Sequence, residues 1–222
     1  MMRSVFLMMT MLLPWRMKRL LLCRVLGFRL AKDARIGFSW LGMGYLEMGE
    51  GSRIGHLNVF KGVDRVVLGP FSAVGRLNLF TAVPTSNRRH FQHLDNRRTE
   101  FVLGRHGRVT MRHLFDCNAS IIVGEFTTIA GYSSQYLTHS IDVVACRQDA
   151  HPVRIGRYCF VGTRCLFLGG SEIPDYSVVA AGSVVRTAFT EVESLYAGVP
   201  ATFRKKMPQE TKYWARTDGW IN

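Results

Sequence analysis

Residues 155–185 read IGRYCFVGTRCLFLGGSEIPDYSVVAAGSVV, and this stretch repeats itself every six residues. The apolar position of the repeat holds Ile155, Val161, Phe167, Ile173 and Val179. Four residues after each comes a small side chain: Cys159, Cys165, Ser171, Ser177 and Ser183. A period of six fits neither an α-helix nor a strand, whose side chains alternate. It predicts an all-β chain that forms a parallel β-helix of hexapeptide units around a narrow core.

The same register extends upstream, in Val123-Gly124-Thr127 and Ile129-Ala130-Ser133, and begins near Ile36. Two matching segments, SRIGHLNVFKGV from Ser52 and SAVGRLNLFTAV from Ser72, are 20 residues apart, close to three hexapeptides. Equivalent side chains should therefore stack on adjacent coils: Ile54 on Val74, Asn58 on Asn78, and Phe60 on Phe80. Such ladders inside a solenoid are structural features.

Two segments interrupt the period. Residues 84–99, PTSNRRHFQHLDNRRT, form a basic loop that either reaches over a neighbouring subunit, clamps an anionic acceptor, or is simply solvated. Residues 142–152, DVVACRQDAHP, separate the coil that ends at His139 from the coil that starts at Ile155. His90 and His93 have metal-ligand spacing but no third ligand nearby, so we expect no metal.

Composition fits one elongated domain in a reducing, cytoplasmic compartment. The chain has 222 residues and a formal net charge of +13, which favours anionic partners. No nucleic-acid-binding module is recognisable, so nucleic acid is not an expected partner. Its five cysteines include no CxxC pair, and Cys159 and Cys165 occupy positions that require a small side chain.

We expect three parts: an apolar, basic segment at 1–33, the β-helix at 34–206, and a tail at 207–222 with a short helix around Tyr213 and Trp214. The longest uncharged run of the first part, Ser4 to Trp15, is too short to span a bilayer. Its basic residues have no acidic neighbours: Arg3, Arg16, Lys18, Arg19, Arg24 and Arg29. The segment either lies on an anionic membrane, as a peripheral contact at its inner face, or caps the β-helix.

The run from Pro152 to Val185, followed by LYAGVPATFRK from Leu195, resembles the hexapeptide-repeat acyltransferases. With AGYSSQYLTHS from Ala130, the chain is most similar to bacterial sugar and polysaccharide O-acetyltransferases. The resemblance is good over 121–206, weaker over 36–120, and absent from the first 30 residues and the tail. It implies a left-handed β-helix, a homotrimer, and acetyl-CoA or another acyl-CoA as co-substrate.

The resemblance implies that His139, just before the second interruption, is the catalytic base. Neutral imidazole suits this role, because a sugar hydroxyl must lose its proton as it attacks a thioester. His139 also falls where a packed coil has no room for its ring, so the coil must open there. Either Asp116 or Asp142 could orient the ring, while His113 and Asp116 could instead contact the acceptor; Asp116 could equally be a plain coil corner.

The resemblance also places coenzyme A along the C-terminal coils. Thr163 and Ala181 match the positions whose backbone contacts the pantetheine arm, and Arg186 and Arg204 are the expected phosphate ligands. We therefore expect an O-acetyltransferase of surface polysaccharide biosynthesis, acting on a sugar, oligosaccharide or lipid-linked sugar. The alternatives are a γ-carbonic-anhydrase-like zinc enzyme, using some of His90, His93, His106, His113 and His151, and a non-catalytic β-helix scaffold.

Overall fold

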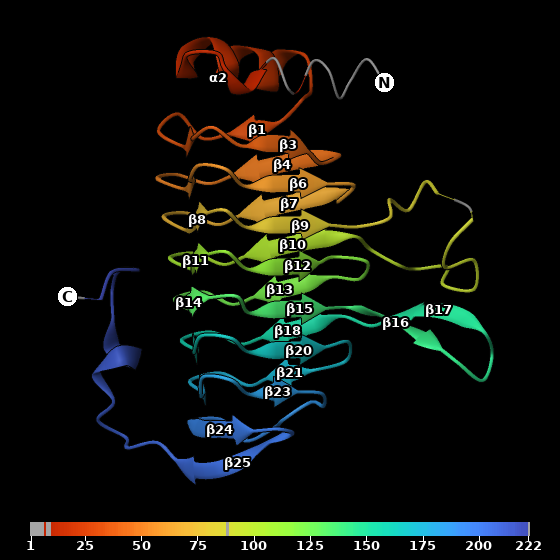
Figure 1. The fold of residues 1–222 in the computed structure, drawn as a ribbon. Coiled ribbons are helices and arrows are strands. Elements are labelled where there is room, and N and C mark those ends of the chain that lie inside the picture. Colours follow the sequence, from red (N-terminus) through yellow and green to blue (C-terminus); the bar gives the residue numbers. More distant parts are fainter. Residues whose placement is uncertain (1–6, 8–9, 88, 222) are drawn as a thin grey trace.

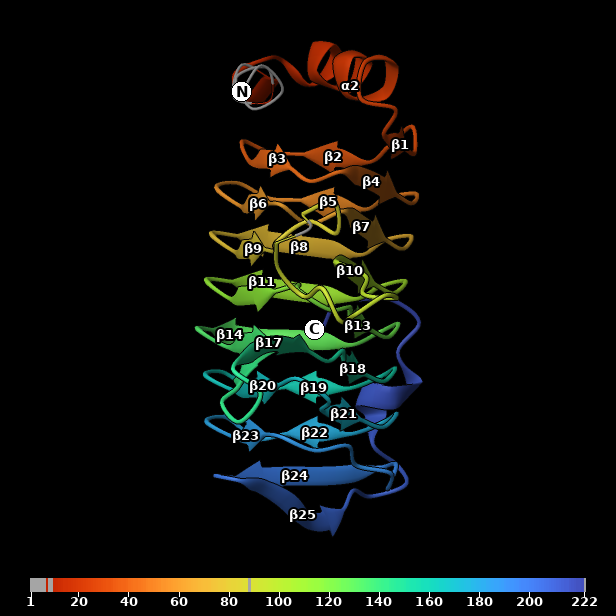
Figure 2. The same cartoon turned by 90° about the vertical axis from the view of Figure 1, so that its right-hand side faces the viewer.

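The computed structural model describes residues 7, 10–87 and 89–221, and these form a column of stacked triangular coils (Figures 1 and 2). Three parallel sheets make the sides, and each complete coil passes through sheets A, B and C in turn. Sheet A contains β1 (Arg29–Leu30), β4 (Tyr45–Met48), β7 (Arg65–Leu68), β10 (Glu100–Leu103), β13 (Ile121–Val123), β18 (Val153–Ile155) and β21 (Glu172–Ile173). Sheet B contains β2 (Arg35–Ile36), β5 (Arg53–Ile54), β8 (Ala73–Arg76), β11 (Arg108–Met111), β14 (Thr128–Tyr132), β19 (Phe160–Val161), β22 (Val178–Val179), β24 (Ser194–Gly198) and β25 (Ala201–Lys206). Sheet C contains β3 (Trp40–Gly42), β6 (Val59–Lys61), β9 (Leu79–Thr81), β12 (Leu114–Asp116), β15 (Gln135–Leu137), β20 (Leu166–Leu168) and β23 (Val184–Val185).

The six-residue period is confirmed: each hexapeptide forms one side of a coil, and three of them make one complete coil. Its apolar residues are buried, and those of sheet C form one column of stacked rings. Adjacent ring centroids in this column lie 4.4 to 4.8 Å apart, in the order Phe60, Phe80, Phe115, Tyr136 and Phe167. Each ring buries a large apolar area and covers its neighbour's face, so the column is a continuous core.

The small-residue position carries a hydrogen-bond ladder. At the corner between sheets B and C, from Ser39 to Ser134, each side chain at this position accepts the backbone N–H of the equivalent residue one coil on, which satisfies a buried donor. Asn58 accepts from Asn78 N at 3.0 Å, and Asn78 accepts from His113 N at 2.9 Å. His113 Nδ1 accepts from Ser134 N at 3.2 Å, and Ser134 Oγ accepts from Cys165 N at 3.1 Å. The predicted stacking of the two matching segments is thus confirmed.

One register prediction is wrong. Ser133 does not hold the small-residue position, because the chain takes one more residue between Ile129 and Tyr136 than between Val161 and Phe167. Gly131, at a φ of +68°, accommodates the extra residue, and Ser133 lies in the turn at a φ of +60°. Ser134 is the buried residue instead.

The ends of the column are closed differently. Helix α2 (Trp15–Arg24) lies across the first coil and covers this end of the column (Figures 1 and 2). Strand β1 shows that coils begin before Ile36, at a two-residue strand too short to display a period. At the other end β24 and β25 pair antiparallel and close the coil. The tail runs back along the column and includes the predicted helix around Tyr213 and Trp214, η1 (Lys212–Ala215). Arg3 lies outside the described residues.

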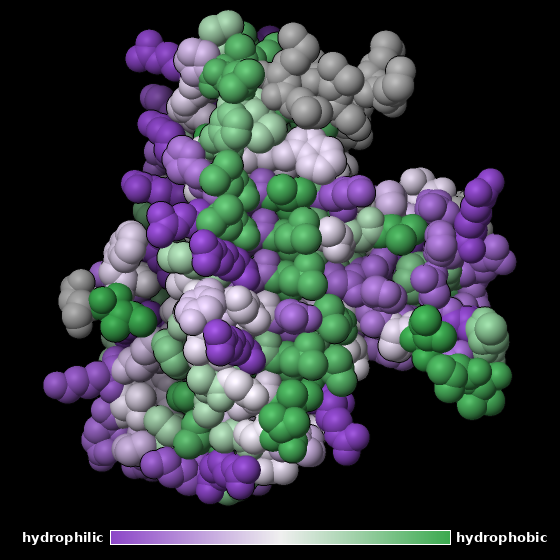
Figure 3. All heavy atoms as spheres, in the orientation of Figure 1, coloured by the Kyte–Doolittle hydropathy of each residue, from purple (hydrophilic) through white to green (hydrophobic). Residues whose placement is uncertain are grey.

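Both interruptions leave the column at the corner between sheets C and A and project to the same side (Figure 1). The second interruption starts at His139 rather than at Asp142, and it is a hairpin of β16 (His139–Asp142) and β17 (Arg147–Ala150). Apolar side chains gather at its tip, where Val143 and Val144 are 82% and 94% exposed (Figure 3). Within the described residues, no helix is both long enough and apolar enough to cross a bilayer.

All five cysteines are free, and Cys159 and Cys165 are buried as predicted. Burial raises the pKa of the Cys159 thiol to about 12, so it packs as a neutral group.

Candidate active site

His139 is the first residue after the coil opens. Thr138 is still buried, its hydroxyl bonded to Asp116 O and to Ala119 N, and the chain then leaves the column as β16. Leu137 pairs with Asp116 on the preceding coil, so the next residues of the two coils lie close together. The result is a histidine side chain that is 40% exposed beside an aspartate side chain that is 6% exposed.

Asp116 holds one edge of the His139 ring. Its Oδ2 is hydrogen-bonded to His139 Nδ1, while Oδ1 accepts from the side-chain amide of Asn118. Because an ionised carboxylate only accepts, Nδ1 is the protonated nitrogen of the neutral ring. Nε2 is therefore left with a free lone pair, as a general base requires.

The basic loop packs against this pair. Phe91 lies edge-to-face with the His139 ring, with centroids 6.4 Å apart and an interplanar angle of 89°. The Arg97 guanidinium lies 4.4 Å from the Phe91 centroid and donates to Val83 O at 2.9 Å and Asn118 O at 3.1 Å. Arg97 thus fastens the loop to the residue that bonds Asp116. Phe91, Arg97 and Asn118 carry no periodic signal in the sequence, because they lie outside the hexapeptide register.

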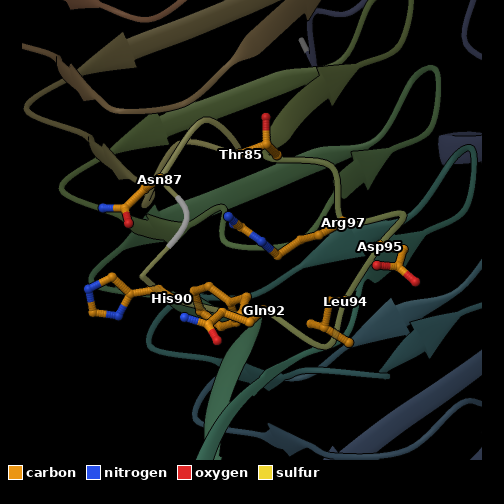
Figure 4. Close-up of a pocket in the computed structure, with 8 residues that line it drawn as sticks. Thr85, Asn87, His90, Gln92, Leu94, Asp95 and Arg97 are labelled. Carbon is orange, nitrogen blue, oxygen red and sulfur yellow. The ribbon is translucent and has the colours of Figure 1, made fainter.

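The loop and the hairpin also contact each other. His90 Nδ1 lies 2.7 Å from Gln148 Oε1, and His93 Nε2 lies 3.7 Å from Asp149 Oδ1. At least three hollows lie at this corner. One of about 190 Å³ is lined by the loop alone (Figure 4). Another of about 610 Å³ is lined by loop, coil and hairpin, including Arg98, Ser120 and Arg154.

Two of the predicted side chains lie away from His139. Asp142 is at the far end of β16, where Oδ1 accepts from Val144 N and Ala145 N, both at 3.0 Å, and caps the hairpin turn. His113 is 2% exposed and belongs to the corner ladder. Its Nε2 lies 2.9 Å from Thr110 Oγ1, and burial lowers its pKa to about 4. Neither residue contacts the ring of His139; Asp116 does.

Two of the residues matched to coenzyme A contacts lie together. Thr163 and Ala181 are in turns between sheets B and C on successive coils. Gly182 N donates to Thr163 O at 2.9 Å, and this bond joins the two turns across one coil rise. Within one chain, Thr163 and Ala181 therefore share a corner, and that corner is not the one that holds His139.

The two arginines matched to phosphate contacts lie apart from that corner and from each other. Arg186 directly follows β23, so it lies at the opposite end of this strand from the turns that hold Thr163 and Ala181. Arg204 is on β25, where its Nε donates to Ala197 O at 3.1 Å. The four matched residues are thus spread over the C-terminal coils and do not form one site within a single chain.

The histidines considered for zinc do not gather either. His93 and His151 both pair with Asp149, whose Oδ2 lies 3.3 Å from His151 Nε2. His106 is stacked between Phe71 and Phe126, and His113 is in the core. Within the described residues, no group of three or more His, Cys, Asp or Glu side chains is placed to hold a metal ion.

Comparison with known proteins supports the fold. No family model and no curated protein matches the chain. Among solved structures, it is similar to a variant of the N-acyltransferase AntD from Bacillus cereus, in complex with dTDP-4-amino-4,6-dideoxyglucose and coenzyme A. The TM-score is 0.54 and the sequence identity is 12%, and the match covers 73% of this chain and 84% of that one. It is also similar to the UDP-N-acetylglucosamine acyltransferase from Campylobacter jejuni, at a TM-score of 0.54 and 13% identity, over 81% and 71% of the two chains. At these identities the likeness establishes the fold, the left-handed parallel β-helix seen in hexapeptide-repeat acyltransferases.

Proposed function

We propose that this chain is an acyl-CoA-dependent O-acyltransferase that transfers an acetyl group to a sugar hydroxyl in surface polysaccharide biosynthesis. The observation that carries the proposal is the Asp116–His139 pair at the corner where the coil opens. The pair is built as a base and its orienting carboxylate, and two excursions surround it. The two similar solved proteins are an N-acyltransferase in complex with a sugar nucleotide and coenzyme A, and a UDP-N-acetylglucosamine acyltransferase, and their names support acyl transfer as the class of reaction.

The chemistry follows from the free lone pair of His139 Nε2. This nitrogen takes the proton of the acceptor hydroxyl while the oxygen attacks the thioester carbonyl. Asp116 stabilises the imidazolium that forms, because its carboxylate faces the opposite ring nitrogen. The tetrahedral intermediate then collapses, the C–S bond breaks, and the imidazolium returns its proton to the departing thiolate. Direct transfer needs no acyl-enzyme.

We propose Thr163 and Ala181 as backbone contacts for the pantetheine arm, and Arg186 and Arg204 as phosphate ligands. Their positions favour an assembly of several copies. Thr163 and Ala181 lie at the corner between sheets B and C, and His139 lies at the corner between sheets C and A. A second copy packed along sheet C can bring its own coenzyme edge beside His139, which one chain by itself does not.

The outer face of sheet C offers a surface for such packing. One aligned row of outward side chains is apolar apart from Gln135. The apolar members are Val59, Leu79, Leu114, Leu166 and Val184. Hydrophobic side chains form vertical bands over the stacked strands in Figure 3. A triangular column that presents one such side is suited to a homotrimer, which we propose as the working assembly.

The test is thiol release from acetyl-CoA with a panel of nucleotide sugars, lipid-linked sugars and free oligosaccharides. An amino-sugar nucleotide in the panel separates N-acylation from O-acylation. His139→Ala should lower turnover by roughly 10²- to 10⁴-fold, the usual contribution of a general base. His151→Ala is the matched control, because His151 is an exposed histidine at the other end of the same hairpin base. Turnover of His139→Ala at the wild-type rate would refute the proposal.

A further inference from the structure

The outer surface of helix α2 is apolar and basic, although its inner surface already closes the column. Lys18 and Leu22, one helical turn apart, face the first coil and are 2% and 0% exposed. On the opposite side, the row Arg16, Leu20 and Arg24 points away from the coils, because residues four apart share one face of a helix. Leu20 is 58% exposed. Packing of the cap therefore does not account for this side.

The exposed apolar side chains extend along the whole segment. Met17 and Leu20 are on α2, at 54% and 58% exposure, and Leu12 and Val25 flank the helix, at 79% and 60% exposure. Arg16 and Arg24 are exposed among them, and no Asp or Glu precedes Asp33 in the sequence. Apolar side chains interleaved with unopposed arginines match the boundary between lipid headgroups and acyl chains.

The helix is firmly attached to the column. Lys18 Nζ donates to Gly37 O at 2.7 Å, and burial lowers its pKa to about 8. Arg19 donates to Ala31 O and Lys32 O, which binds the helix to the turn after β1. A surface that holds α2 would therefore hold the whole molecule in a fixed orientation.

We propose that the exposed surface of α2 docks onto an anionic phospholipid membrane, with the helix in the plane of the interface. The occupant follows from charge complementarity: the cationic surface selects acidic headgroups, and the exposed Met17 and Leu20 select the acyl-chain boundary. Since α2 lies across the end of the column, the column axis then stands away from the membrane (Figures 1 and 2).

The docked column would hold the catalytic corner away from the lipid, an extension that rests on the proposed function. His139 follows β15, the fifth strand of sheet C counted from α2. Four strand spacings and the thickness of the helix place it roughly 30 Å from the lipid. The acceptor would then be a soluble sugar or an outer sugar of a long chain, and a single sugar on a short lipid carrier in the same membrane would not reach it.

The experiment is sedimentation of the full chain with vesicles of phosphatidylcholine alone or mixed with phosphatidylglycerol. We expect binding to the mixed vesicles that weakens in high salt. Arg16→Gln with Arg24→Gln should lower the partition coefficient about 30-fold, because two charges near an acidic surface are lost. Leu20→Glu should lower it at least ~10-fold. Val144→Glu is the matched control, because Val144 is an exposed apolar residue far from α2, and it should bind as wild type.

Three outcomes would overturn the proposal: no binding to mixed vesicles, equal binding to neutral vesicles, or an equal loss in Val144→Glu. Sedimentation velocity without vesicles tests a second copy of the chain as the occupant. If the wild type does not bind vesicles and Leu20→Glu abolishes an oligomer that the wild type forms, the exposed surface of α2 joins two copies of the chain instead. Circular dichroism of each variant checks that it is folded. Vesicle binding is independent of catalysis, so its failure is distinguishable from failure of the proposed function.

Discussion

His113 should make the fold sensitive to acid. Its Nδ1 accepts the N–H of Ser134, so a proton on that nitrogen would replace a hydrogen bond with two opposed donors. Burial lowers the pKa of His113 from 6.5 to about 4. Both folded and unfolded chains hold it neutral above pH 6.5. As the pH falls, the unfolded chain binds the proton first, and stability is lost until the folded pKa is reached.

The size of the effect follows from the shift. A shift from 6.5 to about 4 corresponds to roughly 3 kcal/mol in full, of which about 2 kcal/mol is lost between pH 7 and pH 5. The assay is urea unfolding of wild type and His113→Gln at a series of pH values. The variant should be less stable at pH 7, because it breaks the ladder, yet it should lose about 2 kcal/mol less on acidification.

Asn58→Ala is the control, because it also removes an acceptor of the ladder but takes away no titratable group, so its loss of stability between pH 7 and pH 5 should equal that of the wild type. An equal loss of stability in His113→Gln and wild type between pH 7 and pH 5 would refute the role of His113. The same variant separates a structural role from acceptor binding. We expect an unchanged KM for the acceptor, since the ring does not reach the surface.

Three further substitutions test the corner and the coils. Asp116→Asn should lower kcat roughly 100-fold in the thiol-release assay, with little change in the KM for acetyl-CoA. The reason is that an amide can turn a donor toward Nδ1 of His139 and favour the wrong tautomer of the ring. An unchanged kcat would contradict this role of Asp116. Arg97→Lys should lower kcat and leave the affinity for coenzyme A unchanged, because lysine cannot make all of the arginine's hydrogen bonds to Val83 O and Asn118 O. Equal effects on kcat and on the affinity would indicate general unfolding instead. Gly75→Ala should lower the free energy of unfolding in urea by more than ~3 kcal/mol, because the new Cβ would lie 2.0 Å from Thr110 O. A decrease below ~1 kcal/mol would show that the two coils can move apart.

The corner that holds His139 depends on an interruption of the repeat. A regular coil buries the residue at the small-residue position of a corner, as it does at Ser134 and Cys165. At His139 the chain leaves as a hairpin, so its imidazole is exposed, while Asp116, on the uninterrupted preceding coil, stays buried. The carboxylate is therefore shielded from water on most sides, which strengthens its interaction with the ring.

The sequence by itself determined the coil, because a hexapeptide unit is a local pattern that each strand and turn repeats. It predicted the stacked pairs of Asn58 with Asn78 and Phe60 with Phe80, and it located the opening at His139. Only the tertiary structure decided which groups lie around that histidine. Asp116 is 23 positions away and reaches it through the stacking of coils, and Phe91 reaches it through a loop without any period. The sequence also could not separate a surface histidine from one in the ladder, because His113 takes a position elsewhere filled by serine, cysteine or asparagine, and only the neighbouring coil shows that its nitrogen is an acceptor.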